Sequence, residues 1–142
     1  MKCSEVMTVN PSCCLVTDTV HRAAQLMKSE DVGPIPILDD AESRRLAGVI
    51  TDRDIVLKLV AKDRDPNTTR VSEIMTTDVV TCRIDDDADK AVRLMEEHQV
   101  RRIPIVNDDG QLGGIVSQAD VATRMGQPGK TAEVVKKISQ AA

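Results

Sequence analysis

Two heptads of one pattern decide the organisation of this chain: "GVITDRD" at residues 48–54 and "GIVSQAD" at residues 114–120. Each begins with glycine, continues with two branched apolar residues and a hydroxyl residue, and ends with aspartate three positions after the hydroxyl residue. Branched apolar residues favour a β-strand. A hydroxyl residue followed by an acidic residue three positions later is typical of a helix N-terminus. Each heptad therefore predicts a strand that passes directly into a helix.

The repetition extends far beyond the heptads. "CSEVMT" from Cys3 matches "VSEIMT" from Val71, and "IPI" at residues 35–37 matches "IPI" at residues 103–105, in both cases with an offset of 68 residues. At the heptads the offset falls to 66, so the first copy carries two extra residues around positions 42–45. A surface turn accommodates such a change. The chain thus contains two copies of one unit.

Each copy predicts the element order β-α-β-β-α. In the first helix of each copy, apolar residues recur every three or four positions and so share one face. Thr17 or Asp18 is expected to cap the first of these helices, and Asp86 or Asp87 the second. Two strands and a closing helix follow. The predicted strands are "VVTCRI" (79–84), "IPIL" (35–38), "AGVIT" (47–51), "IPIV" (103–106) and "GGIVS" (113–117), and the inner face of the closing helix in the first copy carries Ile55, Val56, Leu59 and Val60.

These elements predict an α+β fold. The first repeat spans residues 3–61 and the second spans residues 71–125, with a charged linker at 62–70 between them. The C-terminal tail, residues 126–142, follows a glycine- and proline-containing break and is expected to form a short helix at 131–139.

The composition limits the possible partners. Of the 142 residues, 41% are hydrophobic and 30% charged, and the net charge is −4, as in ordinary globular proteins. A nucleic-acid partner is not expected, because it would need a basic patch. No leader peptide or bilayer-spanning run is recognisable, so a cytoplasmic location without membrane contact is expected. The chain has no Phe, Tyr or Trp, so a bound base would rest on aliphatic side chains.

The four cysteines, Cys3, Cys13, Cys14 and Cys82, match no zinc-binding spacing and include no C-x-x-C pair. We interpret them as small buried side chains in a reducing compartment. The alternative is a redox or metal role for Cys13 and Cys14 with His21. His21 and His98 have no recognisable nucleophilic partner, and no glycine-rich phosphate loop is present, so neither catalysis nor a metal site is expected.

The heptads allow two interpretations. In the first, Thr51 with Asp54, and Ser117 with Asp120, are capping boxes that satisfy backbone N–H groups. In the second, the same side chains face a ligand: the aspartate accepts hydrogen bonds from a ribose diol, the hydroxyl contacts ribose or phosphate, and Arg53 contacts phosphate. A hydroxyl can cap a helix and also face a ligand, so both interpretations can hold.

The order of the motifs, twice over, resembles a tandem pair of cystathionine-β-synthase (CBS) domains, a Bateman module. The resemblance rests on h-x-h-P-h followed by G-h-h-[ST]-x-x-D and covers residues 3–125. "GVITDRDIV", "DPNT" and "MEEHQVRRIPIV" further resemble stand-alone CBS-pair proteins of the hypoxic-response type.

This resemblance implies that the repeats pack about a pseudo-twofold axis, with clefts that take AMP, ADP, ATP, NAD or S-adenosylmethionine. It also implies a homodimer, an effector protein as partner and a link to stress or energy sensing. The ligand is regulatory, and no cofactor is required. The expected ligand-binding residues are Thr51, Arg53, Asp54, Ser117, Asp120, Ile35, Pro36, Arg102, Ile103 and Pro104.

The two copies differ in their cations. Arg53 in the first copy corresponds to Ala119, whereas Arg101 and Arg102 in the second correspond to Gly33 and Pro34. We therefore expect one stronger nucleotide site and one that is weak or empty, although Arg101 and Arg102 would equally suit a solvated surface. The alternative function is a ligand-free structural or interaction protein with a cysteine-based redox or metal switch.

Overall fold

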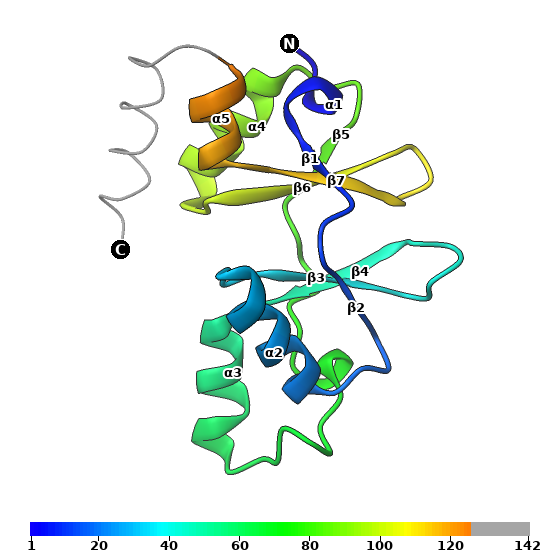
Figure 1. Cartoon of the computed structure of the whole chain (residues 1–142), viewed down its shortest axis with the longest axis vertical. Coiled ribbons are helices and arrows are strands. Elements are labelled where there is room, and N and C mark those ends of the chain that lie inside the picture. The colour runs from blue at the N-terminus through cyan, green and yellow to red at the C-terminus, as the bar shows by residue number, and fades with distance from the viewer. Residues whose placement is uncertain (126–142) are drawn as a thin grey trace. The chain divides into compact units, whose positions relative to one another are not determined.

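The computed structural model describes residues 1–125, which form two compact units (Figure 1). The predicted tail helix at 131–139 lies outside the described residues. Residues 12–79 form the β3–β4 unit, named after its strands β3 (Ile35–Leu38) and β4 (Leu46–Ile50). Of the described residues, 1–11 and 80–125 form the β6–β7 unit, named after β6 (Arg102–Val106) and β7 (Leu112–Ser117). The mixed α+β class predicted from the sequence is confirmed.

The β3–β4 unit contains a three-stranded sheet in the order β2-β3-β4, with β2 parallel and β4 antiparallel to β3. Helices follow the strands as the sequence pattern predicts. The elements are β2 (Cys14–Leu15), α2 (Val20–Glu30), β3 (Ile35–Leu38), β4 (Leu46–Ile50), α3 (Asp52–Lys58) and the 3-10 turns η1 (Val60–Lys62) and η2 (Val71–Glu73).

The β6–β7 unit repeats this arrangement with one more strand, in the order β1-β7-β6-β5. Strand β5 is parallel to β6, and β7 is antiparallel to both β6 and β1. The elements are α1 (Cys3–Val6), β1 (Thr8–Val9), β5 (Cys82–Arg83), α4 (Ala88–His98), β6 (Arg102–Val106), β7 (Leu112–Ser117) and α5 (Gln118–Arg124).

Each unit takes its opening segment from the other repeat. Residues 1–11 pack in the β6–β7 unit, where β1 pairs with β7 through Thr8 opposite Ile115. Residues 71–79 pack in the β3–β4 unit, where Val49 and Thr76 exchange backbone hydrogen bonds of 2.9 Å in both directions. We call residues 1–11 and 71–79 the crossing segments. The turn at the end of each heptad therefore lies beside a crossing segment.

Both cores are aliphatic, as the lack of aromatic residues requires. Ile35, Ile37 and Ile50 are at most 1% exposed in one core, and Ile103 and Ile105 are fully buried in the other. Each such side chain contributes about 1.5–3 kcal/mol when it is buried. These cores fix the strands whose ends carry the heptad turns.

One predicted helix cap is wrong and another is confirmed, and one predicted strand is shorter than expected. The N-cap of α2 is Thr19, which accepts from the Arg22 N–H at 3.2 Å, and not Thr17 or Asp18. Asp18 instead closes the preceding turn by accepting from the Leu15 N–H at 2.8 Å. The cap of α4 is Asp87, one of the two predicted residues. The predicted strand at 79–84 is only Cys82–Arg83, because these two residues alone pair with β6.

The predicted inner face of the closing helix is also partly wrong. Leu59 is 2% exposed and Ile55 packs against the core, but Val56 and Val60 are 56% and 62% exposed. The α-helical part ends at Lys58 and a 3-10 turn follows. Successive residues lie about 100° apart around such a short helix, so only the Ile55–Leu59 stripe reaches the core.

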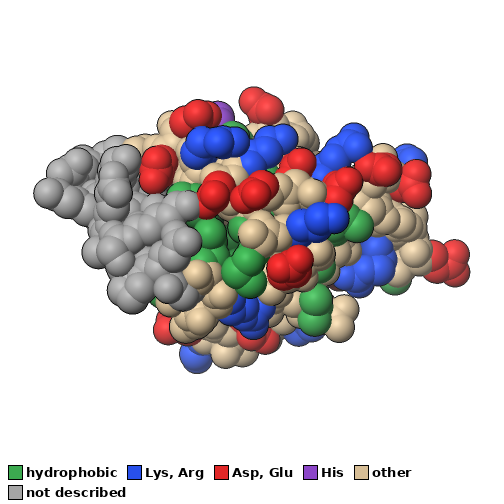
Figure 2. Space-filling model, turned by 90° about the horizontal axis from the view of Figure 1, so that it is seen from above, with side chains coloured by type: hydrophobic (Ala, Val, Ile, Leu, Met, Phe, Trp, Pro, Cys, Tyr) green, Lys and Arg blue, Asp and Glu red, His purple; other side chains and the backbone are tan. Residues whose placement is uncertain are grey.

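Charges of both signs are interspersed on the face seen in Figure 2. Figure 2 shows Lys and Arg side chains alternating with Asp and Glu on one face, with a few apolar side chains between them. Within residues 1–125 no helix has the length and apolar character needed to cross a bilayer.

Candidate functional site

The first hydroxyl–aspartate turn, residues 51–54, connects β4 to α3. Thr51 is the N-cap of α3, and its Oγ1 accepts from the Asp54 backbone N–H at 3.1 Å. Asp54 Oδ2 accepts in return from the Thr51 backbone N–H at 3.0 Å. This reciprocal arrangement satisfies two N–H groups that helix formation leaves without partners. The capping interpretation is therefore confirmed for this turn.

The second hydroxyl–aspartate turn, residues 117–120, repeats the capping box between β7 and α5. Ser117 Oγ accepts from the Asp120 N–H at 3.1 Å, and Asp120 Oδ2 accepts from the Ser117 N–H at 2.9 Å. One contact is added: Ser117 Oγ donates to Asp120 Oδ2 at 3.0 Å. Within residues 1–125 the Thr51 hydroxyl makes no matching contact with Asp54. The Ser117 hydroxyl proton is thus used inside its own turn.

Both aspartates are buried, with Asp54 8% and Asp120 7% exposed. A buried carboxylate needs hydrogen bonds or a cation. Asp54 Oδ1 lies 3.0 Å from Lys58 Nζ, one helical turn later. Asp120 Oδ1 accepts from the Thr8 hydroxyl at 2.9 Å, with Arg124 more distant at 3.8 Å. The corresponding hydroxyl in the other unit, Thr76, lies 3.4–3.5 Å from the Asp54 oxygens.

Lys58 and Arg124 also connect each turn to its crossing segment. Lys58 Nζ donates to the Ile74 carbonyl at 3.2 Å. Arg124 donates to the carbonyls of Val6 and Met7 at 2.9 and 2.6 Å. These carbonyls lie at the end of a short helical segment, where backbone acceptors lack intrahelical partners. A cation four positions after the aspartate therefore serves the same purpose in both units.

The heptad glycines are required by the close approach of the crossing segments. A Cβ at Gly48 would lie 2.6 Å from the Thr76 backbone oxygen, and one at Gly114 would lie 2.6 Å from the Thr8 backbone oxygen. Only a hydrogen atom fits in that space. The first position of each heptad thus has a structural reason, independent of any ligand.

The predicted base-contacting residues lie on the strands beside the turns. Ile35 and Ile103 point into the two hydrophobic cores. Successive side chains alternate between the faces of a strand, so Pro36 and Pro104 lie on the opposite face of each sheet. All four residues are buried.

The predicted cations occupy different places in the two units. Arg102 is directly opposite Ser117 in the β6–β7 pair and is half-buried. Arg53 is exposed in the first turn of α3, and Arg101 is exposed at the end of the loop before β6. The strand register places Arg102 opposite Ser117, and Arg53 directly precedes Asp54 in the sequence. Their contact with a ligand stays a prediction.

Gln118, the residue after Ser117, carries a buried side-chain nitrogen with no hydrogen-bond partner in the part of the chain that the structure describes. An amide donor in that condition is destabilising, by about 1–3 kcal/mol. An acceptor atom of a ligand would satisfy it. The sequence pattern gave no reason to select this residue.

Two further pairs, Thr8 with Thr76 and Lys58 with Arg124, were missed from the sequence. The signal was present in the repeat itself. The threonines recur with the 68-residue offset, and the cations recur with the 66-residue offset. Only the structure shows that the crossing segments bring the threonines to the aspartates.

A family model for the CBS domain matches the chain twice, at residues 3–61 and 71–126. The chain belongs to the CBS-domain family. Hypoxic response protein 1 of Mycobacterium tuberculosis (strain CDC 1551 / Oshkosh) is 36% identical over 121 residues, which cover 85% of this chain and 82% of that protein. The predicted resemblance to stand-alone CBS pairs of the hypoxic-response type is therefore confirmed.

Two solved CBS structures of similar fold contain adenosine compounds. The crystal structure of CBSX2 in complex with AMP has a TM-score of 0.72 and 26% identity, covering 95% of this chain and 98% of that one. The CBS pair of protein MJ0100, in complex with 5'-methylthioadenosine and S-adenosyl-L-methionine, has a TM-score of 0.73 and 25% identity, covering 92% and 98%.

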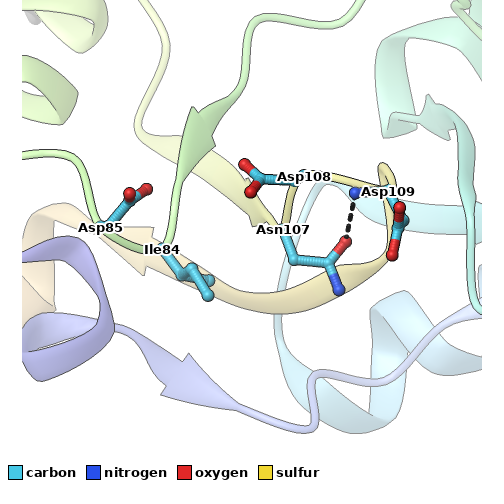
Figure 3. Close-up of a pocket in the computed structure, with 5 residues that line it drawn as sticks. All are labelled: Ile84, Asp85, Asn107, Asp108 and Asp109. Atoms are coloured by element: carbon cyan, nitrogen blue, oxygen red, sulfur yellow. Dashed lines mark hydrogen bonds between the residues drawn. The ribbon is translucent and has the colours of Figure 1, made fainter.

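A separate hollow in this CBS protein lies at the other end of the β6–β7 hairpin. It has a volume of about 280 Å³ and is lined by Ile84, Asp85, Asn107, Asp108 and Asp109. Figure 3 shows that the Asn107 side chain turns back to the Asp109 backbone, where Oδ1 accepts at 3.0 Å. The hairpin turn forms this hollow together with Ile84 and Asp85. Asn107 precedes β7 and Ser117 ends it, so the hollow is separate from the hydroxyl–aspartate turn.

The four cysteines of this CBS protein are thiols, and three of them are buried. Cys3, in a crossing segment, and Cys82, in β5, belong to the same core. The hydrogen bond with the Cys82 side chain, together with burial, holds the pKa of Cys3 well above its usual range. Burial, reinforced by Asp18, raises the pKa of Cys14 to about 11. Cys13 is half-buried.

Proposed function

We propose that this protein is a non-catalytic, cytoplasmic regulatory module that binds an adenosine-containing nucleotide and signals to another chain. Family membership supports this proposal, as do the two related structures that contain adenosine compounds. The observation that carries it is the occurrence, twice, of a hydroxyl and a buried carboxylate on one strand-to-helix turn. A carboxylate accepts the two hydrogen bonds that a ribose diol donates.

In the proposed complex, Asp54 and Asp120 bind the ribose hydroxyls, while Thr51 and Ser117 contact ribose or phosphate oxygen. Arg53 and Arg102 bind phosphate through their guanidinium donors. The base lies against the strands at Ile35–Pro36 and Ile103–Pro104 as the family resemblance implies, with Pro36 and Pro104 on the face away from the cores. A ligand of this kind regulates by binding one conformation of the protein more tightly than another.

The lack of Phe, Tyr and Trp makes the test direct, since the chain contributes almost no near-ultraviolet absorbance. The gently purified protein and its acid-released supernatant are measured, and a nucleobase band in the supernatant is expected. If no nucleotide is carried through purification, AMP, ATP and S-adenosylmethionine are added, and a ligand of the folded state raises the melting temperature. The absence of both a nucleobase band and a melting-temperature shift would refute the proposal.

The matched variant is the Asp54→Asn/Asp120→Asn double substitution. Ligand binding predicts that it loses the nucleobase band or the melting shift. A purely structural role predicts a loss of about 0.5–2 kcal/mol in unfolding free energy for each substituted turn, as for other helix caps, and no ligand effect in the wild type or in the variant. Both quantities are measured on the same samples.

We also propose that the module is a homodimer. Val56, Leu57 and Val60 are 56%, 47% and 62% exposed on α3 and the turn after it. The matching positions in the second repeat include Ala122 and Thr123, which are smaller or polar. Apolar side chains grouped in this way favour an interface. Light scattering should show a dimer that Val56→Lys converts to a monomer, while Ala122→Lys leaves it intact; a monomeric wild type would refute the dimer.

The second candidate function, a cysteine-based switch in an interaction protein, is favoured by the contact between the Cys3 and Cys82 thiols. A thiol reagent distinguishes the candidates. If the cysteines are structural, only half-buried Cys13 reacts quickly in the folded protein, and the other three react on unfolding. Rapid loss of two further thiols upon mild oxidation, reversed by reductant, would support the switch.

A further inference from the structure

The two aspartates differ in how many hydrogen bonds they still have to offer. A carboxylate has two oxygens, each able to accept about two hydrogen bonds. Asp120 Oδ2 already accepts from both the Ser117 N–H and the Ser117 hydroxyl, at 2.9 and 3.0 Å. Its Oδ1 accepts from the Thr8 hydroxyl at 2.9 Å and faces Arg124 at 3.8 Å. Asp120 therefore retains room for at most one further donor while Thr8 stays in place.

Asp54 has fewer close hydrogen-bond partners than Asp120. Its Oδ2 has one close partner, the Thr51 N–H at 3.0 Å, and its Oδ1 has one, Lys58 Nζ at 3.0 Å. The Thr76 hydroxyl lies 3.4–3.5 Å from both oxygens, at the limit of a hydrogen bond. Each Asp54 oxygen can thus accept one hydroxyl of a diol without losing a close contact.

The hydroxyl of the first turn is likewise less engaged in internal hydrogen bonds than the hydroxyl of the second. Ser117 Oγ donates its proton to Asp120, whereas Thr51 Oγ1 only accepts, from the Asp54 N–H, among the contacts of residues 1–125. The Thr51 proton is consequently available to a ligand oxygen. The first turn offers a diol two acceptors and one donor; the second offers them only after internal bonds are broken.

From these contacts we infer that the two turns fill in a fixed order: a ribose diol binds Asp54 first, and it binds Asp120 only by displacing the Thr8 hydroxyl of the crossing segment. This inference rests on the proposed function and adds a regulatory step to it. Occupation of the second site costs one charge-assisted hydrogen bond, and that bond attaches the crossing segment to α5.

The test is calorimetric titration with AMP of the 142-residue chain and five single variants. The wild type should show one stronger site, which Asp54→Asn abolishes and Asp120→Asn leaves in place. Thr8→Val removes the competing hydroxyl and keeps the side-chain shape, so the weaker site should tighten about tenfold, the effect of one lost hydrogen bond to a charged group. Thr76→Val is the matched control and should change either affinity less than twofold.

The outcomes separate this inference from the proposed function. A stronger site that disappears with Asp120→Asn instead of Asp54→Asn overturns the filling order while nucleotide binding stands. Weaker or unchanged second-site binding in Thr8→Val also overturns it, since Thr8 would then position Asp120 rather than compete for it. No heat with AMP, ATP or S-adenosylmethionine in wild type and Thr8→Val overturns both. Thr8→Ser, which keeps the hydroxyl, should behave as the wild type and controls for altered folding.

Discussion

Gly48 and Gly114 show how one residue type serves the same packing need in both repeats. At each glycine, the backbone oxygen of a crossing-segment threonine would lie only 2.6 Å from an added Cβ. A backbone atom cannot move aside as the end of a flexible side chain can. The glycines are therefore required by the packing of the crossing segments, and this packing explains their place at the start of each heptad.

Gly114→Ala should thus lower the free energy of unfolding by about 1–3 kcal/mol, the usual effect of overpacking. Gly113→Ala is the control one residue away, where a Cβ would come no closer than 3.3 Å, to the Ile84 side chain. Urea denaturation of both variants measures the difference. Equal urea midpoints for Gly114→Ala and Gly113→Ala would contradict the close approach of the Thr8 carbonyl to Gly114.

The Asp86 carboxyl makes the stability of the protein depend on pH. Hydrogen bonds from the Arg83 backbone N–H and, secondarily, from Lys90 hold the pKa of Asp86 below its usual range. A carboxyl whose pKa is depressed on folding stabilises the protein above its unfolded pKa, about 3.9, and loses that effect as the pH falls through its folded pKa.

Asp86→Asn should therefore be less stable than the wild type near pH 6, and this difference should shrink as the pH falls below 4. Asp85→Asn removes the same charge from the neighbouring exposed position. The comparison uses urea unfolding at a series of pH values. The wild type could instead remain more stable than Asp86→Asn by the same amount down to pH 2. That result would show that the ionised carboxylate is not the cause of the stability difference.

At the scale of the elements, the sequence was sufficient for most helices and strands. Apolar periodicity located α2 and α4, and the heptads located the junctions β4–α3 and β7–α5. The errors have local causes. Three polar residues in a row before Val20 are all good caps, and only the hydrogen bonds of the turn select Thr19. The apolar residues Val56 and Val60 follow a helical pattern, but α3 is too short to bury more than one stripe.

The capping boxes of the candidate site were predictable because both partners lie within four residues of each other. The contacts with Thr8 and Thr76 were not, since each joins residues from different repeats. The 112-residue separation of Thr8 and Asp120 leaves no local pattern. Internal repetition could have marked these threonines as equivalent, but it does not say which unit each one enters.

Arg124 links α5 to a crossing segment through two hydrogen bonds, because it donates to the carbonyls of both Val6 and Met7. Arg124→Met should lower the free energy of unfolding by about 1–3 kcal/mol, since two hydrogen bonds from a charged group are lost. Amide hydrogen exchange in residues 3–9 should rise with it. Arg124→Lys, with a single compact donor group, should give an intermediate result. Unchanged exchange in residues 3–9 would contradict the attachment.

At the scale of the whole molecule, the crossing segments decide which pieces of the chain can fold. Residues 12–79 contain a complete compact unit, with the Val49–Thr76 pairing and the cover of Gly48 included. Residues 1–68 contain the first repeat but lack Val71 and Ile74, both of which belong to its core. This fragment also contains residues 1–11 but not β7, so β1 has no strand to pair with.

Fragments 12–79 and 1–68, which have the same length, should therefore behave differently. The first should show cooperative thermal unfolding by circular dichroism, although its small size leaves it marginally stable. The second should lack a cooperative transition, because it loses core side chains that each contribute about 1.5–3 kcal/mol. Adding the complementary fragment 69–142 to 1–68 should restore a transition, since it supplies both missing partners. Cooperative unfolding of 1–68 alone would mean that the sequence repeat, and not the unit completed by a crossing segment, is what folds.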